Sequence, residues 1–223
     1  MKKTDLALAF AVGLAVSLSA AARTVTCLSS GEWTFDGAPV TVPHTWNAVD
    51  AADGVNTMLH NPGTSVGSPS YCRGAHTYRR ALPAPKEGKR YFVRCEGVSS
   101  KSELRVNDTY VGEHCGAFTA FAFEITDFLK PSGNELAIVA DNSLDRNVPP
   151  ISGDFSLFGG VYRDVWLIET DSVCISPLED GGSGVVLEPD PKTGKGIAEP
   201  SADAGLYIEE ITGRGESLPV WEF

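Results

Sequence analysis

The sequence predicts an all-β fold, in which a β-sandwich is followed by a short, poorly ordered C-terminal tail. Short runs with alternating apolar positions recur between turn residues from Glu32 onward, and this period of two is typical of half-buried strands. Helical periodicity is scarce, so the long crossover helices that a parallel sheet needs are missing. We expect about eight or nine short antiparallel strands, packed as two sheets and interrupted by two long loops.

The first expected strands are Trp33–Phe35 and Val40–Pro43. Asp36 and Gly37 separate them, and both residue types favour turns. A polar loop rich in Gly, Asn, Ser and Pro then occupies Asn47–Ser70. Loops of that length are often functional rather than simple connections.

Two longer strands are expected after this loop, at Ala75–Leu82 and Lys89–Glu96. In the second of them, Tyr91, Val93 and Cys95 take alternate positions, so their side chains share one face.

A hairpin is expected next, with Ser102–Val106 and Thr109–Gly112 as its strands. Asn107 and Asp108 lie between them and tolerate a left-handed backbone, which suits a two-residue hairpin turn.

The remaining expected elements alternate between strands and connections. They are a strand at Thr119–Thr126, a single turn at Asp127–Leu129, a strand at Leu136–Asp141, a loop at Asn142–Phe158 and a strand at Val161–Glu169. In the first of these strands, Phe121, Phe123 and Ile125 share one side.

The sandwich domain is expected to occupy residues 23–173, and residues 174–223 form a linker and the remnant of a second domain. Asp180–Gly184 is rich in glycine, and Val185–Leu187 starts a new strand. Gly, Pro and charged residues dominate Glu188–Glu216, so this part of the tail is expected to be poorly ordered.

Residues 1–22 are expected to be a secretory signal peptide. Lys2 and Lys3 precede the apolar run Leu6–Leu18, and small residues follow at Ala20–Ala22, so we expect cleavage after Ala22 and a secreted or periplasmic protein. A membrane anchor is the alternative, but about 13 apolar residues fall short of the roughly 20 that span a bilayer.

The net charge of −11 and the pI near 4.8 argue against nucleic-acid and anionic-membrane partners, because both usually select a basic patch. The five cysteines show no CxxC spacing, and no histidine completes a zinc site, so neither a metal nor another cofactor is expected. After export, one or two disulfides could form among Cys27, Cys72, Cys95, Cys115 and Cys174; buried thiols are the alternative.

Five stretches between Glu32 and Asp171 together resemble the N-terminal sugar-binding domain of family 2 glycoside hydrolases, the group with β-galactosidases, β-glucuronidases and β-mannosidases. They are Val42-Pro43-His44-Thr45-Trp46-Asn47; Tyr71-Cys72-Arg73-Gly74 with Tyr78-Arg79-Arg80; Val106-Asn107 with Val111-Gly112-Glu113-His114 and Gly116-Ala117-Phe118-Thr119; Gly133-Asn134-Glu135-Leu136 with Asp141-Asn142-Ser143; and Ser152-Gly153-Asp154-Phe155 with Gly159-Gly160-Val161-Tyr162-Arg163-Asp164-Val165. The resemblance implies a galactose-binding-like jelly roll, and residues from Cys174 to Leu187 are similar to the start of the immunoglobulin-like domain that follows it in such enzymes.

The resemblance implies that Asp154 contacts hydroxyls of a bound sugar. An ionised carboxylate accepts hydrogen bonds from adjacent hydroxyls through its two oxygens, although loop aspartates also cap their own backbone. Tyr71, Arg73 and Arg146 lie in the two long loops and are candidates to line a glycan groove by stacking and hydrogen bonding. Solvated loop residues are the alternative for each of them.

Other residues of these stretches are expected to be structural. The adjacent charges Arg163 and Asp164 suit ion pairs or loop anchors, since neighbouring strand side chains point to opposite faces. Packing and hydrogen bonding are expected of His44, Trp46, His114 and Phe118.

No catalytic residue is expected in this chain. A retaining glycosidase needs two carboxyl groups about 5 to 5.5 Å apart, and in the family both lie on a (β/α)₈ barrel of roughly 250 residues. About 50 residues follow the sandwich, and Glu209 and Glu210 have no scaffold there.

The resemblance therefore implies a noncatalytic domain that binds a β-galactoside or similar carbohydrate weakly, with the immunoglobulin-like and barrel domains as its partners. The alternative is a secreted interaction module without a glycan ligand, which exposed apolar patches would reveal.

Overall fold

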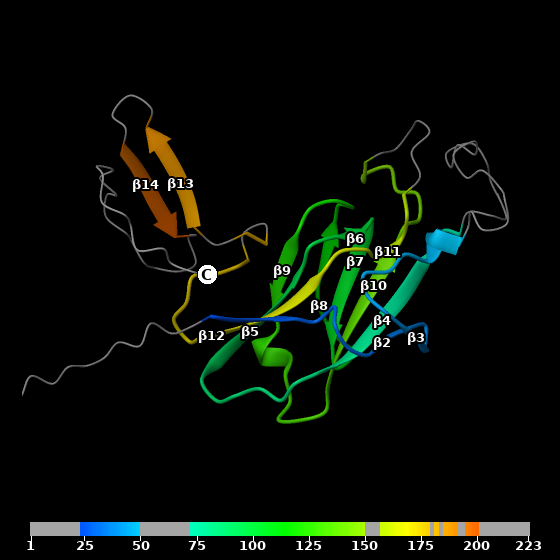
Figure 1. The fold of residues 1–223 in the computed structure, drawn as a ribbon, viewed down its shortest axis with the longest axis horizontal. Helices are drawn as coiled ribbons and strands as arrows, with labels where there is room; N and C mark the ends of the chain where they lie inside the picture. The colour runs from blue at the N-terminus through cyan, green and yellow to red at the C-terminus, as the bar shows by residue number, and fades with distance from the viewer. Residues whose placement is uncertain are drawn as a thin grey trace, which may run out of the picture.

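The computed structural model describes residues 23–49, 72–149, 157–178, 181–182, 185–190 and 195–200, and the described chain is nearly all β (Figure 1). The described residues also include the 3₁₀ turns η1 at Trp46–Val49 and η3 at Thr126–Phe128. The strands are β1 (Thr24–Cys27), β2 (Trp33–Phe35), β3 (Ala38–Val40), β4 (Ala75–Leu82), β5 (Lys89–Cys95), β6 (Val98–Ser99), β7 (Lys101–Val106), β8 (Thr109–Cys115), β9 (Phe121–Glu124), β10 (Asn134–Asp141), β11 (Gly160–Val161), β12 (Val165–Asp171), β13 (Val185–Asp190) and β14 (Lys195–Pro200).

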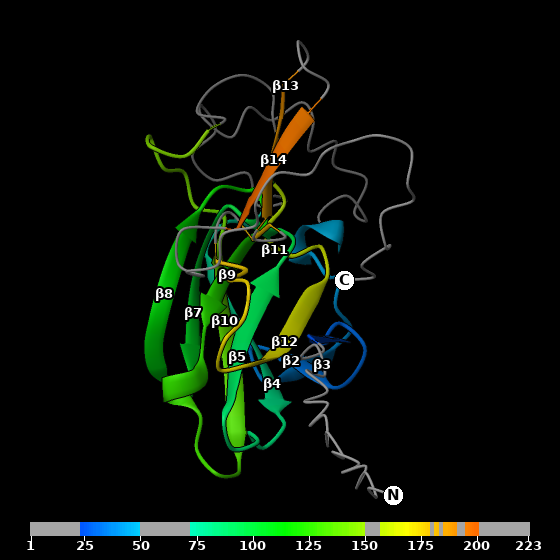
Figure 2. The ribbon, with the colours of Figure 1, turned by 90° about the vertical axis from the view of Figure 1, so that its left-hand side faces the viewer.

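Two antiparallel sheets form the sandwich, as the alternating pattern predicted. The first has the strand order β1-β12-β5-β9, and the second has the order β3-β2-β4-β10-β7-β8. Figure 2 shows the two sheets face to face, with β5 and β12 in front of β4 and β10. Strands β6 and β11 pair with each other in a short two-stranded sheet, and β13 pairs with β14 in a separate hairpin.

Alternate positions of the strands fill the core between the sheets. Tyr91, Val93 and Cys95 of β5 are all buried in it, which confirms the predicted face. Leu136 and Ile138 of β10 face them from the second sheet. Burial of this kind stabilises the fold by about 1.5 to 3 kcal/mol for each large apolar side chain.

The predicted two-residue hairpin is confirmed at Asn107 and Asp108, whose φ angles are +53° and +63°. Both values lie in the left-handed region that Asn and Asp tolerate better than most residues. The hairpin strands are longer than expected, because β8 continues to Cys115 and pairs with Lys101.

The expected strand Val161–Glu169 is two strands in the structure. Val161 of β11 pairs with Val98, whereas Val165 of β12 pairs with Cys95. Residues 162–164 join the two pairings, and the Asp164 carbonyl accepts a hydrogen bond from the Glu96 N–H at 2.9 Å. The change of partner strand therefore falls at Tyr162-Arg163-Asp164, where two charged residues interrupt the apolar positions Val161 and Val165.

Two further strands, β1 and β6, had not been predicted. The side chains of β1 are mostly exposed, and β1 and β6 have only four and two residues, respectively, so each is too short to give a clear period of two. The strand expected at Val185 is present as β13, and its partner β14 lies in the segment that was expected to be poorly ordered. Within the described ranges, no helix is long and apolar enough to cross a membrane; the expected signal peptide lies outside those ranges.

Candidate functional site

A buried junction of two asparagines joins the bases of the two long loops. Asn142, at the end of β10, donates from Nδ2 to Asn47 Oδ1 at 3.1 Å and to the Leu157 carbonyl at 3.0 Å. Asn47, in η1, donates from Nδ2 to the Cys72 carbonyl at 2.7 Å. Both asparagines are almost completely buried. Because buried polar groups need partners, this junction fixes where each loop leaves the sandwich.

Backbone N–H groups complete the junction from both loops. The Gly159 N–H donates to Asn47 Oδ1 at 2.7 Å, and the Gly74 N–H donates to Asn142 Oδ1 at 2.9 Å. Trp46 Nε1 also donates to the Cys72 carbonyl, at 3.1 Å. The first loop is thus held at residues 46–47 and 72–74, and the second at residues 142 and 157–159.

An aromatic cluster adjoins the junction and shares Trp46 with it. Phe35 lies 5.1 to 5.8 Å, between ring centroids, from His44, Trp46, His76 and Tyr78. His44 Nδ1 and the Tyr78 hydroxyl are 2.6 Å apart. Burial lowers the pKa of His44 and raises that of Tyr78 well above its ordinary value, so both side chains are neutral packing groups at neutral pH. The expected structural roles of His44 and Trp46 are confirmed.

His76, one residue of this cluster, also pairs with an aspartate. His76 Nδ1 lies 2.6 Å from Asp36 Oδ2. Burial pulls the pKa of Asp36 upward, but hydrogen bonds from the Thr77 N–H and from His76 outweigh burial and lower it. The pair ties the β2–β3 turn to β4.

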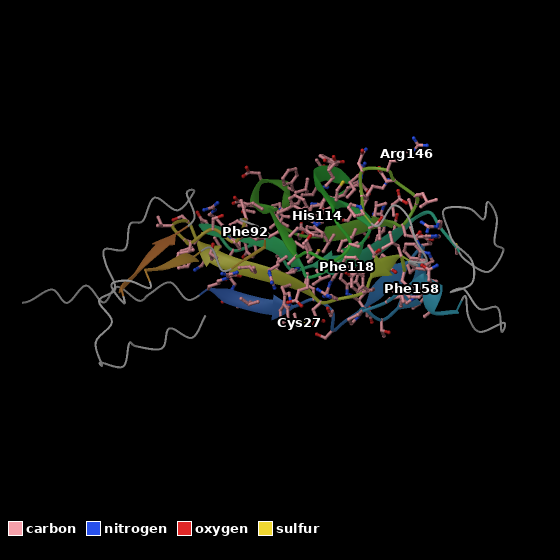
Figure 3. The ribbon with its side chains drawn as sticks, turned by 90° about the horizontal axis from the view of Figure 1, so that it is seen from above. Cys27, Phe92, His114, Phe118, Arg146 and Phe158 are labelled. Atoms are coloured by element: carbon pink, nitrogen blue, oxygen red, sulfur yellow. The ribbon has the colours of Figure 1, made fainter. Side chains whose placement is uncertain are left out.

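The structure describes two of the four predicted sugar-contact residues, Arg73 and Arg146; Tyr71 and Asp154 lie outside the described residues. Arg73 is half-buried, and its Nη1 donates to the Asn142 carbonyl at 2.7 Å. Arg146 is exposed, at the same end of the sandwich as Phe158 (Figure 3). The loop beneath it is held by the Asn147 N–H, which donates to Asp145 Oδ1 at 2.9 Å.

His114 and Phe118 were both predicted to be packing residues, but only His114 is packed. His114 stacks on Phe121 with 4.4 Å between ring centroids, and its Nε2 lies 3.0 Å from Thr119 Oγ1, which confirms a structural role. For Phe118 the prediction is wrong, because its side chain is 61% exposed. Its carbonyl instead accepts a hydrogen bond from Arg163 Nη1 at 3.3 Å, so Arg163 acts as a loop anchor.

Sequence reasoning gave no role to Asn47 and Asn142, although both fall inside quoted stretches. Each is a polar residue directly beside an apolar strand or aromatic segment, at the edge of a long loop. A polar residue at such an edge is a signal for a structural hydrogen bond. The sequence does not show that the two residues pair with each other, because they are 95 positions apart.

Two neighbouring carboxylates near the loops, Asp141 and Asp145, do not suit glycosidic cleavage. Lys101 Nζ lies 3.3 Å from Asp141 and 3.2 Å from Asp145. For Asp141, burial raises the pKa, but Ser143 and Lys101 hydrogen bonds lower it overall; for Asp145, the Asn147 N–H and then Lys101 lower it. A retaining glycosidase needs one carboxyl group with a raised pKa, and both of these remain ionised.

Within the described residues, no group of three or more His, Cys, Asp or Glu side chains is arranged to hold a metal ion. The five cysteines are thiols rather than disulfides, and Cys95 is buried in the core.

The fold and the asparagine junction define a class of protein, a jelly-roll sandwich in which the bases of two long connecting segments are joined by buried hydrogen bonds. Residues 30–171 match the family described as "Glycosyl hydrolases family 2, sugar binding domain". The chain belongs to that family.

Curated relatives and solved structures agree with this membership. A β-glucuronidase of Bacteroides fragilis is 38% identical over 185 residues, which cover 78% of this chain and 25% of the relative. A putative β-glucuronidase of Formosa agariphila is 39% identical over 131 residues, or 57% of this chain and 14% of the relative. The crystal structure of a putative β-galactosidase from B. fragilis has a TM-score of 0.66 at 34% identity, with 79% of this chain and 28% of that chain covered. The chain therefore spans about a quarter of the length of the B. fragilis proteins that it matches.

Proposed function

We propose that this chain is the noncatalytic sugar-binding lobe of a β-glucuronidase- or β-galactosidase-type glycoside hydrolase. The Asn47–Asn142 junction carries the proposal, because it fixes the bases of both loops that contain the predicted contact residues. The relatives named above act, by their names, on β-glucuronides and β-galactosides. A β-glucuronide is therefore the first ligand to test, and a β-galactoside is the second.

In this proposal Asp154 accepts hydrogen bonds from adjacent sugar hydroxyls, Tyr71 stacks on the ring, and Arg146 donates to the sugar. Arg73 donates to the sugar or positions the loop through the Asn142 carbonyl. The affinity of the lobe alone is expected to be weak, because small-ligand sites usually bury most of the ligand surface. The bond-breaking carboxyl pair belongs to a barrel domain and an immunoglobulin-like domain joins the two, as in the family that the sequence resembles.

Calorimetric titration of the full chain with methyl β-D-glucuronide and methyl β-D-galactoside tests the proposal. We expect millimolar binding of at least one, and Asp154→Asn should weaken it about tenfold, the loss of one charge-assisted hydrogen bond. Glu87→Gln, in the exposed turn before β5, is the control and should leave the affinity unchanged. Absence of heat with both sugars, or equal affinity of Asp154→Asn, would contradict the proposal.

A second candidate function is a protein-interaction module. Phe118, Leu144 and Phe158 are 61%, 52% and 46% exposed, respectively, and exposed apolar side chains often mark a partner surface when they gather. If this function is correct, the chain binds a hydrophobic dye, and Phe118→Ser with Phe158→Ser reduces that binding. A monomer without dye binding would count against it.

We also propose that the protein is exported after removal of residues 1–22. The basic start, apolar run and small residues described above support this proposal. Mass spectrometry of the protein from the periplasm or medium should find Arg23 as the first residue. Retention in the cytoplasm with Met1 intact would contradict it.

A further inference from the structure

The outward face of the four-stranded sheet is covered rather than open to solvent. Phe92 and Ile168 point away from the core, on the side opposite Val93 and Leu167, yet they are 0% and 1% exposed. Residues 172–178 and 181–182, called the strap here, pass over this face (Figure 2). Arg90 Nη1 lies 3.5 Å from Cys174 Sγ, and Arg94 Nε donates to the Gly181 carbonyl at 2.5 Å, so arginines of β5 hold the strap.

Between the end of the strap and strands β1 and β12 there is a groove of about 390 Å³. Its volume lies in the lower part of the roughly 300–1,000 Å³ range of small-ligand sites. The groove shares no lining residue with the asparagine junction. Its lining residues are Arg23, Val25, Arg94, Glu96, Trp166, Ile168, Gly181 and Gly182.

The indole of Trp166 is a fixed platform in this groove. Trp166 Nε1 donates to Glu96 Oε1 at 2.9 Å, and Arg94 Nη1 donates to the same oxygen at 2.9 Å. One carboxylate thus orients both the aromatic ring and a guanidinium. A ring held in this way binds a ligand with little loss of side-chain entropy.

The charges in the groove do not balance. Two arginines and one carboxylate line it: Arg94 pairs with Glu96, whereas Arg23 takes part in no ion pair among the described residues. The Nε of Arg23 is buried without a hydrogen-bond partner there. Burial, and then the neighbouring charge of Arg94, lower the pKa of Arg23, although arginine stays protonated at any ordinary pH. The described residues that line the groove therefore carry a net positive charge, on a chain whose net charge is −11.

We propose that this groove binds an anionic saccharide, with the sugar ring on Trp166 and its carboxylate or sulfate group on Arg23 and Arg94. The indole offers a flat apolar face to the C–H side of a sugar ring, while guanidinium groups prefer planar oxyanions. The small volume favours a mono- or disaccharide over an extended peptide. This site is additional to the loop site of the proposed function.

Nitrogen-15 labelling of tryptophan in the full chain distinguishes the two sites. The Trp166 indole N–H reports on the groove, whereas the Trp46 indole N–H, bonded to the Cys72 carbonyl, reports on the loop end. Trp166→Phe assigns the first signal. Titration with methyl β-D-glucuronide should move the Trp166 signal, and the uncharged methyl β-D-glucoside should not; glucose 6-sulfate tests the sulfate alternative.

Arg23→Gln should weaken the glucuronide-induced shift of Trp166 about tenfold in affinity. Arg105→Gln, on the outer face of the other sheet, is the matched control and should leave it unchanged. Movement of Trp46 alone, an equal response to the glucoside or to acetate, or full affinity of Arg23→Gln would overturn the groove proposal. If Trp166 responds while Asp154→Asn has no effect on any affinity, the groove stands and the loop-site proposal fails.

Discussion

The indole ring of Trp46 packs directly against the backbone of Gly159, so that a side chain at position 159 would overlap the ring. Trp46 begins the first long loop, and Gly159 ends the second. This contact and the asparagine junction bring the two loop bases together, although 112 residues separate Asn47 from Gly159. The geometry of the loop end therefore depends on a small residue as well as on hydrogen bonds.

Gly159→Ala should lower the free energy of unfolding by about 3 kcal/mol, because an overpacked site forces the ring or the backbone to move. Gly133→Ala is the control: its φ is +68° and no atom lies within 4 Å of an added Cβ. It should cost about 1 kcal/mol from left-handed backbone alone. Urea unfolding measures both, and the Trp46 indole signal should shift in the first variant only. Equal losses would show that crowding is not the cause.

Asn142→Ala should destabilise the protein by about 3 kcal/mol, since the variant removes the buried hydrogen bond from Asn142 Nδ2 to Asn47 Oδ1 and the bond that Asn142 Oδ1 accepts from the Gly74 N–H. Hydrogen exchange at Gly74 and Gly159 should accelerate. The control is Asn147→Ala, at an exposed position, with a change within about 0.5 kcal/mol. A loss below about 1 kcal/mol for Asn142→Ala would argue that water replaces the junction.

The Arg90–Glu124 pair should make stability depend on pH. Arg90 donates to Glu124 from Nε at 2.9 Å and from Nη2 at 2.7 Å, and these hydrogen bonds lower the pKa of Glu124 against the opposing effect of burial. The folded pKa lies below the unfolded value of about 4.3, so the stabilisation is complete above that value and is lost as pH falls through the folded pKa.

Glu124→Gln should therefore be less stable than the parent chain by about 1 kcal/mol near neutral pH, and the difference should disappear at low pH. Urea midpoints across the pH range measure it, with Glu87→Gln as the control. A difference that stays constant with pH would assign the loss to packing.

Removal of the strap should expose Phe92 and Ile168. A chain that ends at Asp171 is expected to be about 3 kcal/mol less stable than one that ends at Gly182, from the apolar area returned to water. It should also bind a hydrophobic dye. Equal stability of the two chains would show that another segment covers this face.

Burial raises the pKa of Cys95 to about 12 against the weaker effect of Arg94, so its thiol should resist alkylation near neutral pH. Cys72 and Cys115 are exposed and should react first with iodoacetamide. Mass spectrometry of the intact and the urea-unfolded chain checks this order. Early alkylation of Cys95 in the folded chain would contradict its burial.

Much of the sandwich could be predicted from local patterns. The period of two identified β5 and its core face Tyr91, Val93 and Cys95, and the residue types Asn107 and Asp108 identified the hairpin turn. Strand β1 escaped prediction because four mostly exposed residues form too short a pattern. The break between β11 and β12 escaped because residues on both sides of it are equally apolar.

The sequence by itself determined the class of fold and the family, because alternation, turn residues and ordered motifs are local properties of the chain. The tertiary structure decided the rest. It paired Asn47 with Asn142, exposed Phe118 instead of packing it, and brought Arg23 beside Arg94 and Trp166. These contacts join residues that are far apart in the chain. Only the packing of the two sheets and the strap decides which polar groups share a buried space and which charges lack a counterion.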